Sequence, residues 1–327
     1  MPDWIQTTQL KLKRKIYFRA DASGGIGYGH FIRSLALADM LKDDFSCTFF
    51  TVHPTDYQVG ELEKVCDYVA LNEETKFDDF LSYLKGNEIV VLDNYFYTTD
   101  YHTQIKAKGC KLVCIDDPHC IRYNCDVLIS HGFVFPSDFD VHASTIIKTG
   151  VEWALLRKPF LKKTNWNRNR ENAIVVNFGG SDPYNVTERI VSQLVGLQLP
   201  YKIRVILGDR VYLSEKCREG VEILHNLTAE QMAELFDTAA RGFLSASTVC
   251  IEGLSRGLPM IVGYYVDNQE KGYQRMAEQN VISPIGDLRR LAASDIIAAI
   301  NYFSQMNHID IHPELIKNKY IKLFSEL

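Results

Sequence analysis

A glycine-rich segment that ends in a histidine is the most unusual feature of the sequence. Four glycines stand at positions 24, 25, 27 and 29, and His30 follows the last of them. Glycine tolerates positive φ and close backbone approach, so this segment could offer bare N–H groups to a phosphate or a sugar. Its spacing is not the Gly-x-Gly-x-x-Gly of a dinucleotide-binding turn, and the acidic residue expected about 20 positions later is missing. The pattern therefore argues against NAD and makes His30 a candidate for catalysis.

His30 is expected at the start of a helix, where it has two interpretations. The macrodipole at a helix N-terminus favours a neutral imidazole, which can accept a proton as a general base. A single histidine can equally be a structural residue of a core. The adjacent glycines favour the catalytic interpretation, because such a segment is unfavourable unless a ligand approaches it closely.

Two more turns in the first half of the chain place polar groups after apolar runs. Tyr95 follows Asp93 and Asn94, and its hydroxyl could orient a water beside the histidine, although one of 17 tyrosines could also simply pack. Asp116 and Asp117 follow another apolar run, either as an acid–base pair or as a cap for the next segment.

The second half contains turns whose chemistry suits a nucleoside diphosphate. Gly179-Gly-Ser-Asp182 can form a backbone nest for an anion. Ser247 and Thr248 stand where a strand leads into a helix, and the free N–H groups there suit a diphosphate. Glu252, one turn deeper, is either a surface glutamate or an acceptor for the two hydroxyls of a ribose. The amide of Asn268 suits sugar hydroxyls or an acetamido group.

The elements that must position these turns form two series of β–α units. In the first series we expect strands at 15–20, 47–52, 67–71, 88–92, 111–115 and 127–130. In the second we expect them at 173–178, 201–207, 221–224, 242–244 and 260–263, with a last helix near 313–326. The polar segment 157–170 contains a proline and has no periodicity, so it is predicted to be a linker.

This alternation predicts an α/β fold of two Rossmann-like domains whose parallel sheets face each other across a cleft. The N-terminal domain would span 1–160 and carry the glycine-rich segment and the histidine, and the C-terminal domain would span 171–327 and bind the nucleotide. Ligands of such sheets lie at the carboxyl ends of the strands, where all of the turns described above are expected.

The length, net charge and residue composition of the chain limit the kinds of partner that it is expected to bind. The chain has 327 residues and a formal net charge of −5, which fits two domains and disfavours a nucleic-acid partner. It has no apolar run long enough to span a membrane and a polar N-terminus, so we expect a cytoplasmic location, no membrane partner and a monomer. Four of the eight cysteines cluster at 110–125 beside His119, but without a Cys-x-x-Cys pair, so no metal site is expected.

Taken together, these segments resemble the UDP-sugar hydrolases of the pseudaminic acid pathway, which cleave UDP-2,4-diacetamido-2,4,6-trideoxy-β-L-altropyranose. They also resemble the lipid II-forming N-acetylglucosaminyltransferase. The matching segments are Phe18-Arg-x-Asp-x-Ser, Ile26-Gly-x-Gly-His30 with Arg33, Asp93-x-Tyr95, Trp153-Ala-Leu-Leu-Arg157, Gly179-Gly-Ser-Asp182, and Ser245-x-Ser247 through Glu252 to Asn268-Gln269. The chain departs from the family pattern at Asn94, where a serine is usual, and at Lys158-Pro159, where an acidic residue is usual.

The resemblance implies the two-domain B-type glycosyltransferase fold and a hydrolase that needs neither metal nor cofactor. It implies that His30 is the general base, that Tyr95 positions the water and that Glu252 holds the ribose. The implied substrate-binding residues are Gly27, Gly29, Arg157, Gly180, Ser181, Ser247, Thr248, Glu252 and Asn268. Two alternatives remain: a glycosyltransferase that uses the same UDP site, and a nucleotide-sugar binding protein without turnover.

Overall fold

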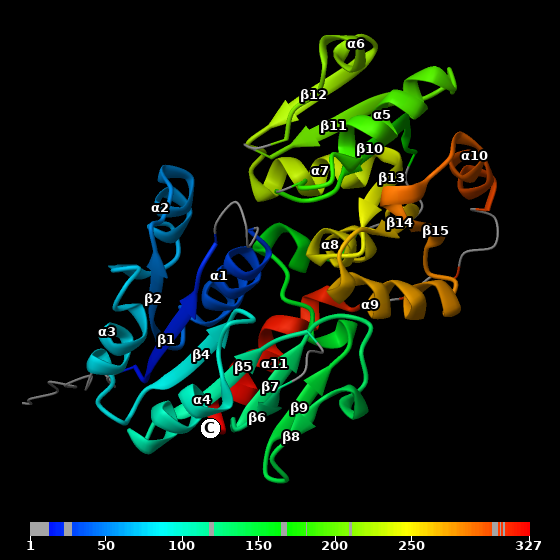
Figure 1. Ribbon diagram of the computed structural model, residues 1–327. Helices are drawn as coiled ribbons and strands as arrows, with labels where there is room; N and C mark the ends of the chain where they lie inside the picture. The colour runs from blue at the N-terminus through cyan, green and yellow to red at the C-terminus, as the bar shows by residue number, and fades with distance from the viewer. Residues whose placement is uncertain are drawn as a thin grey trace, which may run out of the picture.

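Two parallel sheets, one in each half of the chain, form the framework of the computed structural model (Figure 1). The structure describes residues 13–22, 28–117, 121–164, 169–180, 182–208, 211–302, 307, 309 and 311–327. The predicted fold class, with two Rossmann-like domains, is confirmed. The boundaries at 160 and 171 remain a prediction.

The N-terminal sheet has seven parallel strands in the order β3-β2-β1-β4-β5-β7-β9. They are β1 (Lys15–Ala20), β2 (Ser46–Val52), β3 (Asp67–Leu71), β4 (Ile89–Asp93), β5 (Lys111–Ile115), β7 (Val127–Ser130) and β9 (Ile146–Thr149), and the short pair β6 (Arg122–Tyr123) and β8 (Asp140–Val141) lies beside them. Every residue of β4 is buried, as expected for a central strand covered on both faces.

Helices cover both faces of this sheet. They are α1 (Gly29–Leu41), α2 (Asp56–Leu62), α3 (Lys76–Tyr83) and α4 (Thr99–Ala107), with 3-10 turns η1 (Pro136–Asp138), η2 (Val151–Trp153) and η3 (Lys158–Leu161). Alternate residues of β4 point to opposite faces: Val91 joins the core under α1, whereas Val90 and Leu92 join the core under α3 and α4.

The C-terminal sheet has six parallel strands in the order β12-β11-β10-β13-β14-β15. They are β10 (Glu171–Asn177), β11 (Lys202–Leu207), β12 (Val221–His225), β13 (Ala239–Ser245), β14 (Met260–Tyr264) and β15 (Ser283–Asp287). Its helices are α5 (Val186–Gly196), α6 (Glu215–Arg218), α7 (Ala229–Thr238), α8 (Thr248–Ser255), α9 (Asp267–Glu278) and α10 (Ala293–Asn301), with the 3-10 turn η4 (Leu288–Arg290). The strand β15 was not expected, because Pro284 and Gly286 interrupt its sequence.

The last helix, α11 (Pro313–Ser325), crosses back to the N-terminal half (Figure 1). The Tyr320 hydroxyl donates to the Trp153 carbonyl at 2.5 Å, and the Phe324 ring packs edge-on against Phe45. The expected linker begins by forming η3, whose Phe160 is fully buried. The two halves thus share one continuous hydrophobic core beneath the cleft.

Candidate active site

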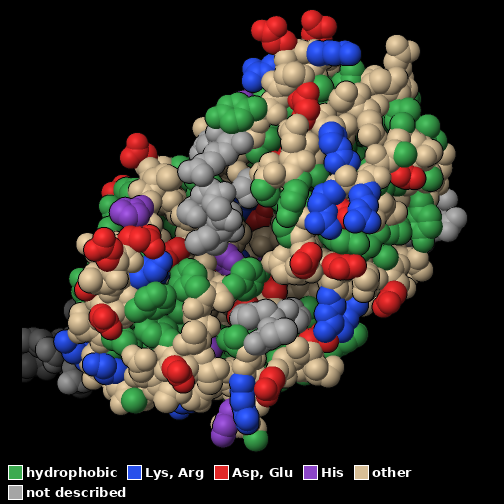
Figure 2. Space-filling view, in the orientation of Figure 1, with side chains coloured by type: hydrophobic (Ala, Val, Ile, Leu, Met, Phe, Trp, Pro, Cys, Tyr) green, Lys and Arg blue, Asp and Glu red, His purple; other side chains and the backbone are tan. Residues whose placement is uncertain are grey.

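A cleft of about 1020 Å³ lies between the two sheets, and the turns after their strands line it. The N-terminal wall includes Gly29, His30 and Tyr95, and the C-terminal wall includes Gly180, Ser247, Thr248, Glu252 and Asn268. Figure 2 shows the hollow between the two halves, with histidine and acidic side chains inside it. Two predicted site residues, Gly27 and Ser181, lie outside the described residues.

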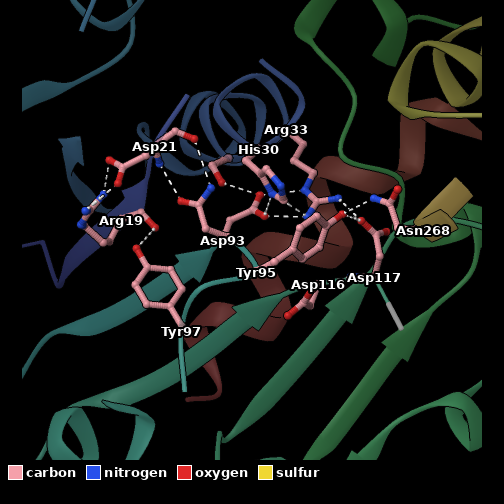
Figure 3. Close-up of polar contacts among 12 residues, drawn as sticks. Arg19, Asp21, His30, Arg33, Asp93, Tyr95, Tyr97, Asp116, Asp117 and Asn268 are labelled. Atoms are coloured by element: carbon pink, nitrogen blue, oxygen red, sulfur yellow. Dashed lines mark hydrogen bonds and ion pairs between the residues drawn. The ribbon is translucent and has the colours of Figure 1, made fainter. Parts of the chain in front are cut away.

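His30 is buried in the first turn of α1 and is held by Asp93, the last residue of β4 (Figure 3). Its Nδ1 lies 2.6 Å from Asp93 Oδ1. Arg33 donates to the same carboxylate from Nε at 2.7 Å and from Nη2 at 2.6 Å, and the Ser34 hydroxyl donates at 2.9 Å. The first turns of α1 therefore wrap three donors around one buried carboxylate.

The charge state of Asp93 decides which nitrogen of His30 carries the proton. Burial raises the pKa of Asp93, but the charges of Arg33 and His30 and their hydrogen bonds outweigh it, so this pKa is lowered from its usual value. Nδ1 lies 3.1 Å from Arg33 Nη2 as well, but the ionised carboxylate at 2.6 Å is the shorter contact and only accepts hydrogen bonds, so we assign the proton to Nδ1. This leaves Nε2 as the basic nitrogen of the ring.

Tyr95 lies edge-on to His30, with 4.6 Å between the ring centroids. Its hydroxyl donates to Asp117 Oδ2 at 2.5 Å and accepts from Asn268 Nδ2 at 2.8 Å. Burial and the Asp117 charge raise the pKa of Tyr95 well above its usual value, so the hydroxyl stays protonated. The structure thus brings together His30, Tyr95 and Asn268, although Asn268 comes from the opposite wall of the cleft.

Asp117 belongs to this cluster, and its backbone N–H donates to Asp116 Oδ1 at 2.8 Å. Besides accepting from Tyr95, its carboxylate accepts from Arg33 Nη1 at 3.1 Å. Burial raises the pKa of Asp117, but the charges of Arg33 and His131 and the Tyr95 hydrogen bond lower it overall. Arg33 therefore bridges two ionised carboxylates beneath the cleft.

Asn94, which stands where the resembling family usually has serine, anchors the start of the glycine-rich segment. Its Oδ1 accepts from the Asp21 backbone N–H at 2.7 Å, and its Nδ2 donates to the Asp21 carbonyl at 3.1 Å. The Asp21 carboxylate in turn accepts from Arg19 Nη2 at 2.8 Å and from the Val52 N–H at 2.9 Å. Figure 3 shows Arg19 and Asp21 of this network beside the histidine cluster.

The glycines of the C-terminal wall permit close approach of backbone segments. Gly179 has φ of 105°, which favours glycine. A Cβ on Gly180 would lie 2.8 Å from the ring of Tyr28, and one on Gly208 would lie 2.5 Å from the Gly180 carbonyl oxygen. Gly29, by contrast, has no atom of the described residues within 4 Å of its Cβ position, so its packing against that part of the chain does not demand a glycine.

The N-terminus of α8 opens toward the same space. Ser247 is its N-cap, but the side chain makes no capping hydrogen bond to the first turn, and Thr248 is the first helical residue. The Ser247 hydroxyl instead lies 3.1 Å from that of Ser245. The first turn has no acidic residue, so the helix dipole there is not neutralised by its own side chains.

Glu252 and Arg157 form a two-pronged ion pair. Arg157 Nε and Nη2 donate to the two carboxylate oxygens of Glu252 at 2.7 and 2.8 Å. Burial lowers the pKa of Arg157, but the Glu252 charge raises it overall. Glu252 is only 3% exposed, which rules out the surface-glutamate interpretation. The segment after η2 thus holds the glutamate of α8 at the cleft wall.

His131, which follows β7, is a cleft residue that the sequence patterns did not single out. It is buried, lines the cleft, and its Nδ1 has no hydrogen-bond partner within the described part of the chain. Burial and the Arg33 charge lower the pKa of His131 to about 4. A lone histidine after an apolar strand carries no sequence signal that separates it from a core residue.

Two features are absent from the described residues. No group of three His, Cys, Asp or Glu side chains there is arranged to hold a metal ion. No helix within the described ranges is both long and apolar enough to cross a bilayer.

Comparisons with known proteins confirm the predicted resemblance. No family model matches the chain. It is 27% identical over 285 residues to the UDP-2,4-diacetamido-2,4,6-trideoxy-beta-L-altropyranose hydrolase of Campylobacter jejuni, an alignment that covers 80% of this chain and 98% of that protein. It is 23% identical to an uncharacterized protein of Methanocaldococcus jannaschii, covering 91% of this chain and 63% of that protein.

The fold is similar to that of solved glycosyltransferases. The crystal structure of Acinetobacter baumannii MurG superposes with a TM-score of 0.61 at 13% identity, covering 96% of this chain and all of that one. This likeness confirms the expected B-type glycosyltransferase fold.

Proposed function

We propose that this chain is a hydrolase that releases UDP from a UDP-2,4-diacetamido-2,4,6-trideoxyhexose and gives the free sugar, a precursor for a nonulosonic acid of the pseudaminic type. The similarity to the Campylobacter hydrolase supports the substrate class. The observation that carries the proposal is the His30–Asp93 pair, because a buried ionised carboxylate on Nδ1 leaves Nε2 as a base beside the cleft.

In the proposed reaction a water attacks the anomeric carbon and His30 Nε2 takes its proton. The bond between that carbon and the diphosphate oxygen breaks, and UDP leaves with the electron pair. Before the reaction, Arg33, Asp93 and Asp117 carry a net charge of −1, and protonation of His30 brings the cluster to neutrality. The imidazolium that forms is therefore stabilised in place.

Tyr95 acts as a positioning group in this scheme and not as a base. Its raised pKa keeps the phenol protonated, and its proton is committed to Asp117. The edge-on contact with the His30 ring limits the orientations of the imidazole. Asn268, bonded to the same hydroxyl, would face the sugar from the opposite wall.

The C-terminal wall would hold UDP. Ser247, Thr248 and the nest at Gly180 would bind the diphosphate through backbone N–H groups and the dipole of α8, which spreads the charge of the leaving group. Glu252 would accept from the ribose hydroxyls with the lone pairs that Arg157 leaves free. UDP is a good leaving group once its charge is dispersed, so the scheme requires no general acid.

A glycosyltransferase is the second candidate, and the structural similarity to MurG favours it. Such an enzyme would use the same UDP site but deliver the sugar to an acceptor. The two functions differ in one observable, because only a hydrolase releases UDP when no acceptor is present.

The test is UDP release from a panel of UDP-2-acetamido and UDP-2,4-diacetamido sugars, with EDTA present and no acceptor. We expect turnover of a diacetamido substrate that disappears in His30→Ala, while the affinity for UDP stays within a few-fold. His142→Ala, at an exposed histidine of the same domain, is the matched control and should retain full turnover. No release across the panel would favour an acceptor-dependent transferase or a binding protein, and loss of activity in EDTA would contradict a metal-independent reaction.

A further inference from the structure

One face of α9 spans the cleft and contacts the N-terminal half at two places. Asn268, Lys271 and Arg275 are spaced three and four residues apart, so they share a face of the helix. Asn268 reaches the Tyr95 hydroxyl at 2.8 Å. Lys271 Nζ lies 2.7 Å from Asp138 Oδ1, and Arg275 Nη2 donates to the same oxygen at 2.9 Å. In Figure 1, α9 lies above the segment that follows β7.

Asp138 is held in position both by its own loop and by α9. It ends η1, and its Oδ2 accepts from the Phe135 N–H at 2.8 Å and also from Arg275 Nη1. The guanidinium of Arg275 stands 4.2 Å from the centre of the Phe135 ring and donates to the Phe133 carbonyl at 3.3 Å. The carboxylate is 7% exposed. Arg275 therefore contacts this loop through a bidentate ion pair with Asp138, a cation–π contact with the Phe135 ring and a hydrogen bond to the Phe133 carbonyl.

The two contacts differ in strength. Asn268 and Tyr95 share a single hydrogen bond between two neutral side chains. A two-pronged, charge-assisted pair such as Arg275–Asp138 is stronger and more directional. Asn268 and Arg275 are seven positions apart in α9, which is about 10 Å along a rigid helix. Fixing Arg275 on Asp138 therefore restricts where Asn268 can lie.

We infer that Asp138 and Arg275 are positioning residues that hold α9 across the cleft and thereby keep Asn268 on Tyr95. This role rests on the proposed function, since Asn268 and Tyr95 act there on the sugar and the water. Loss of the Arg275 side of the pair leaves Lys271 as the remaining contact of α9 with Asp138 in the described part of the chain, so α9 moves more freely with its own domain and Asn268 is held less firmly at the reacting centre.

The first test needs no catalysis. Hydrogen–deuterium exchange is compared for the wild type, Arg275→Gln and Arg289→Gln. Arg289 is the matched control, because it also pairs with an aspartate through two nitrogens and lies 5.5 Å from a tyrosine ring, but within one domain. We expect Arg275→Gln to speed exchange both in 133–139 and in the first turns of α9, in opposite domains, while the control changes neither. Unchanged exchange in both segments would overturn the inference.

The second test asks whether Arg275 acts through Asn268. We expect Arg275→Gln to lower kcat/KM for the intact UDP-sugar about tenfold while UDP affinity and Tm stay close to those of Arg289→Gln. In an Asn268→Ala background the same substitution should have little further effect, because the group it positions is gone. Independent, multiplicative losses would refute the positioning role. A wild-type protein that releases no UDP would defeat the proposed function alone, since the exchange experiment still decides whether the pair holds α9.

Discussion

Replacement of Asp93 by asparagine tests the centre of the site, because the carboxylate both orients His30 and balances Arg33. Oδ1 accepts from His30 and from Arg33 Nη2, while Oδ2 accepts from Arg33 Nε and Ser34. An amide has one acceptor oxygen and one NH₂ group. Whichever way it is turned, the NH₂ group meets an N–H of Arg33, so one contact becomes repulsive.

This geometry leads us to expect a loss of stability and a loss of kcat, each of a definite size. Breaking a buried ion pair from one side costs about 3–5 kcal/mol, a large share of the roughly 5–15 kcal/mol that stabilises a typical domain. Loss of an oriented general base costs about 10²–10⁴ in kcat. We therefore expect Asp93→Asn to lower Tm clearly and, in the fraction that remains folded, to lower kcat by two orders of magnitude or more.

The assay measures UDP release at saturating substrate together with Tm by circular dichroism. Asp237→Asn is the control, because Asp237 forms a similar partly buried pair with Arg256 away from the cleft, with Nε at 2.7 Å. It should lose stability but keep kcat per folded molecule. If Asp93→Asn behaves like this control, Asp93 is only a structural ion-pair partner and the proposed base is not oriented by it.

Three further substitutions have distinct expected outcomes. Tyr95→Phe removes the hydroxyl that accepts a hydrogen bond from Asn268, and we expect kcat for UDP release to fall about 10- to 100-fold. The affinity for UDP, measured by titration calorimetry, should not change. Glu252→Gln breaks the charged pair with Arg157 and places an NH₂ group against its N–H groups, so UDP affinity should fall at least tenfold in the same assay. His131→Asn should change the stability in acid. The native pKa of His131, about 4, lies below the usual 6.5, so the unfolded chain binds a proton between these values that the folded chain does not. The free energy of unfolding of the wild type should therefore fall by up to about 3 kcal/mol from pH 6.5 to pH 4, and the variant should not show this fall. Urea midpoints across this range that fall equally in both proteins would contradict the last expectation.

The sequence predicts the positions of the site residues much better than their partners. His30 and Tyr95 follow β-type runs, and parallel strands bring their carboxyl ends to one edge, so proximity could be expected from pattern alone. The sequence patterns include Asp93 only as part of a turn motif, because a buried acidic residue at the end of a strand resembles the edge of a core. Arg33, three residues after His30, lies on the same helix face, which was a usable signal.

Contacts between the two halves were not predictable from pattern. Asn268 and Tyr95 are 173 residues apart, and Arg157 and Glu252 are 95 apart. Periodicity reports which face of an element is apolar but not which surface it covers. Helix α11 shows this limit, since its pattern predicts a helix but not that Tyr320 packs against Trp153 of η2 in the other half of the chain.

The return of α11 also bears on how the chain is made. Ile316, Tyr320 and Phe324 are fully buried, and they close a core that begins with the strands of the first half. Roughly 150 residues separate η3 from this helix, which at about 5–20 residues per second is about 8–30 s of synthesis. During that interval the nascent N-terminal half carries an uncovered apolar surface on the ribosome. The N-terminal core is therefore completed only after α11 has been synthesised, and a stop codon shortly before α11 would yield a chain with both sheets encoded but an aggregation-prone first half.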